Sequence, residues 1–151
     1  MNWMNKIEPK TSQIQFFVIL RQIRLLAIAI ILTLSLIFFT GLAVSGGNVN
    51  PSLSIYNLVT FILCPIFCAG SYLLKKNMLK KVTLLNFTKS YFSAIVLPYA
   101  LSELGGIICI TTSLFMNQNI LYAAIGYAIT ILYLFFNFPR EEDYKNFVER
   151  K

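Results

Sequence analysis

One acidic residue lies where an apolar residue would be expected. Glu103 is the only charged residue between Ser90 and Pro139, a stretch dominated by apolar and small side chains. Near the midplane of a membrane, a carboxylate that faces lipid costs roughly 2.5 to 3.5 kcal/mol, so such a residue should face protein or water. A carboxyl group at that depth can exchange a proton or donate a hydrogen bond when it is protonated. Glu103 is therefore a candidate proton or ion site, and the alternative is a structural hydrogen bond between helices.

Neutral side chains that could bond to Glu103 are expected at a similar depth in the other apolar segments. No lysine or arginine lies at this depth, so an ion pair within one chain is excluded. Tyr127 and Thr130 should share a helix face because they are three residues apart. The candidate partners are Ser35 and Thr33, Cys64, Tyr127 and Thr130.

The residue inventory excludes most familiar membrane chemistry. The chain has no histidine and a single aspartate, Asp143. A Ser-His-Asp triad, a histidine-ligated haem or zinc and a paired-aspartate metal site are therefore excluded. Cys64, Cys68 and Cys109 all lie within apolar runs, so we expect them to be reduced core residues. We expect no catalytic residue, no metal and no cofactor.

The composition predicts an integral membrane protein. Hydrophobic residues make up 57% of the 151 residues and charged residues only 13%, against about 25% charged residues in soluble domains. Crossing ~30 Å of hydrocarbon at 1.5 Å per residue takes about 20 residues. Four segments approach that length. We predict a single all-α domain, a bundle of four transmembrane helices at residues 25–44, 55–74, 92–115 and 120–138.

The distribution of positive charge predicts the orientation of these helices. All 13 lysines and arginines precede the first segment, lie in the basic loop 75–91, or follow the fourth segment in the tail 139–151. The two other breaks carry none, and cations near a span stay cytoplasmic. Both termini should therefore be cytoplasmic. Cleavage of the first segment as a signal peptide is disfavoured, because its apolar run is longer than the 7 to 15 apolar residues that are usual in a signal peptide.

Two basic or amphipathic segments should lie at the membrane surface. Residues 12–21 predict a short interfacial helix that leads into the first span. The basic loop alternates lysine pairs with apolar residues, a pattern that suits anionic lipid headgroups, although topology signalling alone would also explain it. The same rule explains the net charge of +7 without nucleic-acid binding. The candidate headgroup contacts are Lys75, Lys76, Lys80 and Lys81.

Small residues predict close packing between the third and fourth helices. Ser102 and Gly106 form a small-xxx-small pair. Gly105, two residues after Glu103, is a further position without a side chain. Such residues let membrane helices approach closely. Ala124 and Ala128 are the matching pair in the fourth segment.

Residues 91–140 carry a recognisable arrangement. ALSE at 100–103 is followed by two glycines, MNQN at 116–119 forms a short turn, and FPRE at 138–141 follows an aromatic-rich last span. This stretch resembles a loose set of small, uncharacterised bacterial inner-membrane proteins with four helices. The resemblance implies a location in the inner membrane and carries no activity.

Two functions from different classes fit these features. The favoured one is a non-enzymatic subunit or accessory protein of a membrane complex, either a homo-oligomer or part of a larger assembly. Its contacts would involve the third and fourth spans and the basic loop. The alternative is a proton-linked transporter of a small solute that works as a homo-oligomer, with Glu103 as the exchanging group and Tyr127 as its partner. A membrane enzyme is the least favoured, because the catalytic inventory is poor.

Overall fold

The computed structural model describes residues 8–46, 51–82 and 87–141. Within these ranges the chain is all-helical, as the sequence predicts, and contains no strand. Most of the tail 139–151, including Asp143, and part of the basic loop lie outside them. The elements are α1 (Glu8–Val44), a 3-10 turn η2 (Pro51–Leu53), α2 (Ser54–Lys80), α3 (Phe87–Thr111), a π-helical turn η4 (Thr112–Met116) and α4 (Ile120–Phe136).

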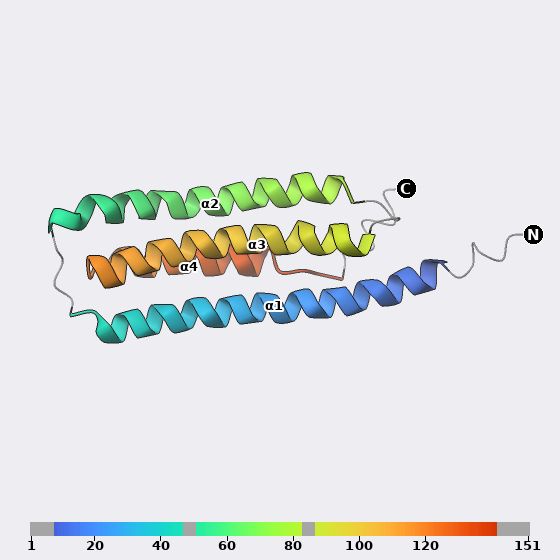
Figure 1. Ribbon diagram of the computed structural model, residues 1–151, viewed down its shortest axis with the longest axis horizontal. Helices are drawn as coiled ribbons and strands as arrows, with labels where there is room; N and C mark the ends of the chain where they lie inside the picture. Colours follow the sequence, from blue (N-terminus) through green and yellow to red (C-terminus); the bar gives the residue numbers. More distant parts are fainter. Residues whose placement is uncertain (1–7, 47–50, 83–86, 142–151) are drawn as a thin grey trace, which may run out of the picture.

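The four α-helices lie side by side in one bundle, with α3 and α4 between α1 and α2 (Figure 1). Helix α3 packs against each of the other three. The start of α1, the end of α2 and the start of α3 lie at the same end of the bundle, and α4 runs toward this end but stops short of it (Figure 1). We call this the charged end, because no charged residue except Glu103 lies between Arg24 and Lys75 or between Lys89 and Arg140. The opposite end is the uncharged end.

Three of the helices are long and apolar enough to cross a membrane, namely those over Phe16–Val44, Pro51–Lys80 and Lys89–Met116. Helix α4 is shorter. Its 17 residues measure about 25 Å, less than the ~30 Å of a bilayer core. It stops two residues before the predicted boundary at Phe138, because Pro139 has no N–H and disfavours helical backbone in the residue before it.

Helix α1 is one continuous helix of 37 residues and not an interfacial helix joined to a separate span. No glycine or proline lies between Lys10 and Gly41, so nothing in the sequence interrupts it. A single stripe of apolar side chains at helical spacing faces the bundle along most of its length. The buried members are Phe16, Ile19, Leu20, Ile23, Ala27, Ile30, Leu34 and Phe38.

Helix α2 has its polar side chains inside and its apolar side chains outside. Its buried residues are Asn57, Cys64, Cys68 and Ser71, whereas large apolar residues cover its outer surface. Only 17% of the most apolar 18-residue stretch of this helix is buried in the bundle. An apolar surface of this extent would cause association in water, whereas lipid solvates it. This pattern is compatible with a membrane protein and hard to reconcile with a water-soluble one.

A tight turn joins α3 to α4 at the uncharged end. The last turn of α3 widens into the π-helical η4, and Gln118 takes the left-handed backbone conformation with φ of 53°. The side chain of Asn119 then accepts a hydrogen bond of 3.3 Å from the backbone N–H of Tyr122. Asn119 is therefore the N-cap of α4, which explains why this helix begins at Ile120.

We expect Asn119→Ala to destabilise the fold by about 1 kcal/mol, because it leaves an N–H of the first turn of α4 without its partner. Asn119→Ser is the matched control, since a serine hydroxyl can also accept this bond. The free energy of unfolding in mixed detergent and SDS micelles measures both. Equal losses in the two variants would show that the cap does not stabilise α4.

Candidate functional site

Glu103 lies on the side of α3 that faces away from α2. Gly105 contacts α2 so closely that an added Cβ would lie 2.6 Å from Cβ of Phe67. Gly106 faces α4, where the same atom would lie 2.8 Å from Oγ1 of Thr130. Residues two apart on a helix point about 200° apart, so Glu103 is opposite Gly105. Its side chain is half-buried at the surface of the bundle.

Within the described residues, Glu103 makes no hydrogen bond and no ion pair. Ala100, one turn before it, is exposed, whereas Ile107, one turn after it, is half-buried against the core. No other charged group is present between Lys89 and Arg140. The carboxyl group therefore lies in an apolar part of the surface without a partner from the described chain.

Two of the expected partners of Glu103 instead bond to each other. The hydroxyl groups of Ser35 in α1 and Tyr127 in α4 are 2.8 Å apart. Ser35 gives its own proton to the carbonyl of Ile31 at 2.7 Å, so Tyr127 is the donor in the pair. The Tyr127 ring also stacks on Phe38, with centroids 4.6 Å apart. These contacts join α4 to α1 and do not include Glu103.

Thr130 and Cys64 form a second internal contact. The Thr130 hydroxyl donates to the carbonyl of Gly126 at 2.9 Å and lies 3.4 Å from the Cys64 thiol. Cys64 in turn lies beside the thiols of Cys68 and Cys109. All three cysteines are free and buried. Among the described residues, no group of three or more cysteine, aspartate or glutamate side chains is arranged to hold a metal ion.

Small polar side chains line the contact between α2, α3 and α4 along much of the bundle, and we call this contact the polar seam. Among the described residues it contains no charged side chain, and its only ionisable groups are the three cysteine thiols. Sequence reasoning did not single out Asn57, which is fully buried with both side-chain polar atoms unpartnered within the described residues. The seam consists of Asn57, Cys64, Cys68, Ser71, Ser102, Cys109, Ser113 and Thr130.

Glycines bring α3 and α4 together along this seam. Ser102 and Gly106 are buried in the region where the sequence predicts close packing, whereas Gly105 contacts Phe67 of α2 and not α4. On α4, however, the close approach to α3 occurs at Gly126, where an added Cβ would collide with the Cys109 sulfur. Of the two residues expected to make this contact, Ala124 is half-buried in the core, while Ala128 is exposed. Ala128 is two residues from Gly126 and therefore on the opposite side of α4.

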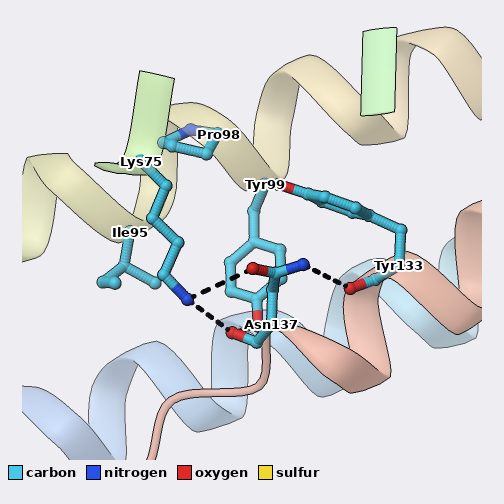
Figure 2. A pocket seen from close by; sticks show the side chains of 6 residues that line it. All are labelled: Lys75, Ile95, Pro98, Tyr99, Tyr133 and Asn137. Carbon is cyan, nitrogen blue, oxygen red and sulfur yellow. Dashed lines mark hydrogen bonds between the residues drawn. The ribbon is translucent and has the colours of Figure 1, made fainter. Parts of the chain in front are cut away.

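At the charged end, side chains from two helices bind the C-terminus of α4 (Figure 2). Lys75 of α2 donates to the carbonyl oxygen of Asn137 at 3.1 Å and to its side-chain oxygen at 3.5 Å. Tyr99 of α3 donates to the same carbonyl at 2.8 Å and to that of Leu134 at 3.3 Å. The last carbonyls of a helix lack partners within the helix and carry partial negative charge. A lysine and a tyrosine are suitable donors for them.

Helix α1 contributes a third donor to the same region. Arg24 donates through Nε to the carbonyl of Pro139 at 3.3 Å, and its Nη1 lies 3.4 Å from the Glu141 carboxylate. We call Lys75, Tyr99 and Arg24 the C-terminal clamp. The cleft around Lys75 and Tyr99 has no space for a water-sized molecule. The clamp therefore fixes the end of α4 and is not a ligand pocket.

Lys75 thus does not lie where the sequence analysis expects it. It was expected at the lipid headgroups, but it follows Cys64, Cys68 and Ser71 on the buried face of α2 and bonds to Asn137. The other expected headgroup lysines, Lys76, Lys80 and Lys81, are exposed.

In comparisons with known proteins, no family model, no curated protein and no solved structure matches the chain. No residue role is therefore transferred from a relative. The functional assignment depends on the geometry of Glu103, the polar seam and the C-terminal clamp.

Proposed function

We propose that this protein is a multi-pass protein of a bacterial inner membrane and acts as a non-enzymatic subunit or accessory protein of a membrane complex. Three long apolar helices and the apolar outer surface of α2 support the membrane location. The resemblance of residues 91–140 to bacterial inner-membrane proteins supports the choice of membrane.

The charge distribution supports a cytoplasmic location for the charged end. Cations close to the ends of spans are retained on the cytoplasmic side. A fourth crossing would consist of α4 together with the non-helical residues 137–140, in which the clamp binds the carbonyls of Asn137 and Pro139 in place of helical partners. Both termini would then be cytoplasmic. The cations within the described residues are Lys10, Arg21, Arg24, Lys75, Lys76, Lys80, Lys81, Lys89 and Arg140.

The observation that carries the proposal is the unpartnered carboxyl group of Glu103 on the surface of α3. In an apolar environment a polar group without a hydrogen bond is costly, and the described chain supplies no partner. A neighbouring polypeptide that covers this face would supply one and would also bury Ala100, one helix turn away. The surface around Glu103 is therefore the proposed contact with another subunit, which is either a second copy or a different protein.

Photo-crosslinking from this surface tests the proposal. We would replace Ala100, one helix turn from Glu103, with a photoreactive amino acid, and place the same group at the exposed Leu132 of α4 as the control position. We expect discrete protein adducts from position 100 in native membranes. Adducts with lipid alone at both positions would contradict the contact.

Substitutions of Glu103 then test the role of the carboxyl group. Glu103→Gln should keep the adduct, because a neutral amide can replace a neutral acid in a hydrogen bond. Glu103→Leu should reduce its yield about three- to tenfold, as expected for one interhelical hydrogen bond in a membrane. Thr33→Leu, which removes an exposed hydroxyl from α1, is the matched control and should have no effect.

The alternative is a proton-linked transporter of a small solute, formed as a homo-oligomer. The position of Glu103 at the surface of α3 favours a route between copies, because the polar seam inside each chain is uncharged. In proteoliposomes with a pH-sensitive dye, Glu103→Gln would then abolish solute-dependent proton movement, while Glu103→Asp would retain part of it. Persistence of proton movement in Glu103→Gln would contradict this alternative.

A further inference from the structure

A second polar site lies at the charged end, between the end of α2 and the start of α3. It is an open cleft of about 270 Å³ lined by Met78, Lys81, Lys89, Ser90 and Ser93. Of the five described residues that line it, two are cationic, two carry hydroxyl groups and none is acidic. The cleft is separate from the C-terminal clamp and from Glu103.

The polar groups of this cleft are available to bind a ligand. Within the described residues, neither lysine and neither serine makes a hydrogen bond or an ion pair. Ser90 and Ser93 are half-buried and share a face of α3, because they are three residues apart. Two ammonium groups and two hydroxyl donors form a suitable set for the oxygens of a phosphate group.

The surface next to the cleft is apolar on the side that leads toward the middle of the bundle. Leu74 lies one turn below Met78 on α2, and Leu97 lies one turn below Ser93 on α3. Both leucines are exposed, with 36% and 52% of their surface accessible. A molecule whose phosphate occupies the cleft would therefore have an apolar surface along which to lay a hydrocarbon chain. A free phosphate ion would make no use of this surface.

We propose that the cleft binds the phosphate group of an anionic phospholipid, with an acyl chain along Leu74 and Leu97. Lys81 and Lys89 supply the positive charge, and Ser90 and Ser93 donate hydrogen bonds to the phosphate oxygens. The proposal rests on the membrane location proposed above and is independent of the contact at Glu103. The proposed lipid site therefore contains Lys81 and Lys89, between the end of α2 and the start of α3, and does not include Lys75.

Native mass spectrometry in a neutral detergent tests this site by titration with phosphatidylglycerol and phosphatidylcholine. We expect preferential binding of phosphatidylglycerol to the wild-type chain. The double variant Lys81→Gln/Lys89→Gln should weaken this binding about 30-fold, the effect expected for two cations next to an anionic headgroup. The matched control is Lys76→Gln/Lys80→Gln, which removes the same charge from exposed positions outside the cleft and should change binding less than threefold.

A second variant separates a discrete site from general charge attraction. Ser90→Ala/Ser93→Ala keeps the net charge and should still weaken phosphatidylglycerol binding about fivefold, because it removes two donors to a charged acceptor. No change in this variant, or equal losses in the two lysine variants, would overturn the site. Displacement of the lipid by inorganic phosphate at equal concentration would overturn the lipid assignment. The crosslink at position 100 would survive either failure.

Discussion

Gly106→Leu should open the polar seam and separate α3 from α4. Even a Cβ at this position would lie 2.8 Å from both Cγ2 and Oγ1 of Thr130, and leucine adds three more carbon atoms. Overpacking of this kind costs about 1 to 3 kcal/mol or more, against a gain of about 1 kcal/mol in helix propensity. We expect a net loss of about 2 kcal/mol.

The buried cysteines provide a direct measurement of this opening. Cys64, Cys68 and Cys109 all lie in the seam and should react slowly with a maleimide in detergent micelles. If the helices must separate before a thiol can react, the alkylation rate is proportional to the population of the opened state. A stability lower by about 2 kcal/mol raises that population, and therefore the rate, about 30-fold. Gly106→Ala should give an intermediate rate.

Ala128→Leu is the matched control for this experiment. It also replaces a small residue by leucine in the same pair of helices, but Ala128 is exposed and faces away from the seam. We expect thiol reactivity within about twofold of the wild type, since exposed substitutions usually cost little. A large increase in Ala128→Leu, or none in Gly106→Leu, would contradict the packing of α4 through Gly126 and Thr130.

Lys75→Met should loosen the C-terminus of α4. The variant keeps a long apolar stem and removes the ammonium group that donates to Asn137. Hydrogen bonds from charged groups contribute about 1.5 to 3 kcal/mol. Since Tyr99 still binds the same carbonyl, we expect the low end of this range and amide exchange about tenfold faster over residues 134–141, measured by hydrogen–deuterium exchange.

Lys76→Met is the control for the loss of one positive charge. Lys76 is exposed and makes no hydrogen bond or ion pair in the described part of the chain. Its substitution should leave exchange at the end of α4 unchanged. Equal effects of the two substitutions would mean that Lys75 acts only through its charge and not through the clamp. Tyr99→Phe should have an effect similar to that of Lys75→Met, because it removes the other donor to Asn137.

The sequence predicts the helices well, because crossing a membrane sets local requirements on length and composition. Four apolar segments separated by turn residues and charges correspond to α1, α2, α3 with η4, and α4. The sequence predicts less well where the helices end next to charged residues. Helices α1 and α2 extend past the apolar segments to Glu8 and Lys80, because no helix breaker follows the change in composition.

The candidate site is predicted less completely, because partners depend on how each helix is rotated about its axis. The sequence identifies Glu103 as unusual, and it identifies Ser35, Tyr127 and Thr130 as polar residues at a similar depth. It does not show that Ser35 pairs with Tyr127, or that Thr130 pairs with Cys64, while Glu103 is left without a partner.

The sequence by itself therefore determined the helical class, the number of apolar segments, the clustering of charge in alternate breaks and the presence of one carboxyl group, Glu103, in an apolar segment. Only the tertiary structure decided that Lys75 faces inward, that Gly126 and not Ala128 makes the close contact with α3, and that the three cysteines meet. The reason is physical. In water an apolar stripe identifies the buried face of a helix, but lipid is as apolar as a protein core, so hydrophobicity does not distinguish inside from outside. Close packing and hydrogen bonds between helices make that choice, and they depend on residues far apart in the chain.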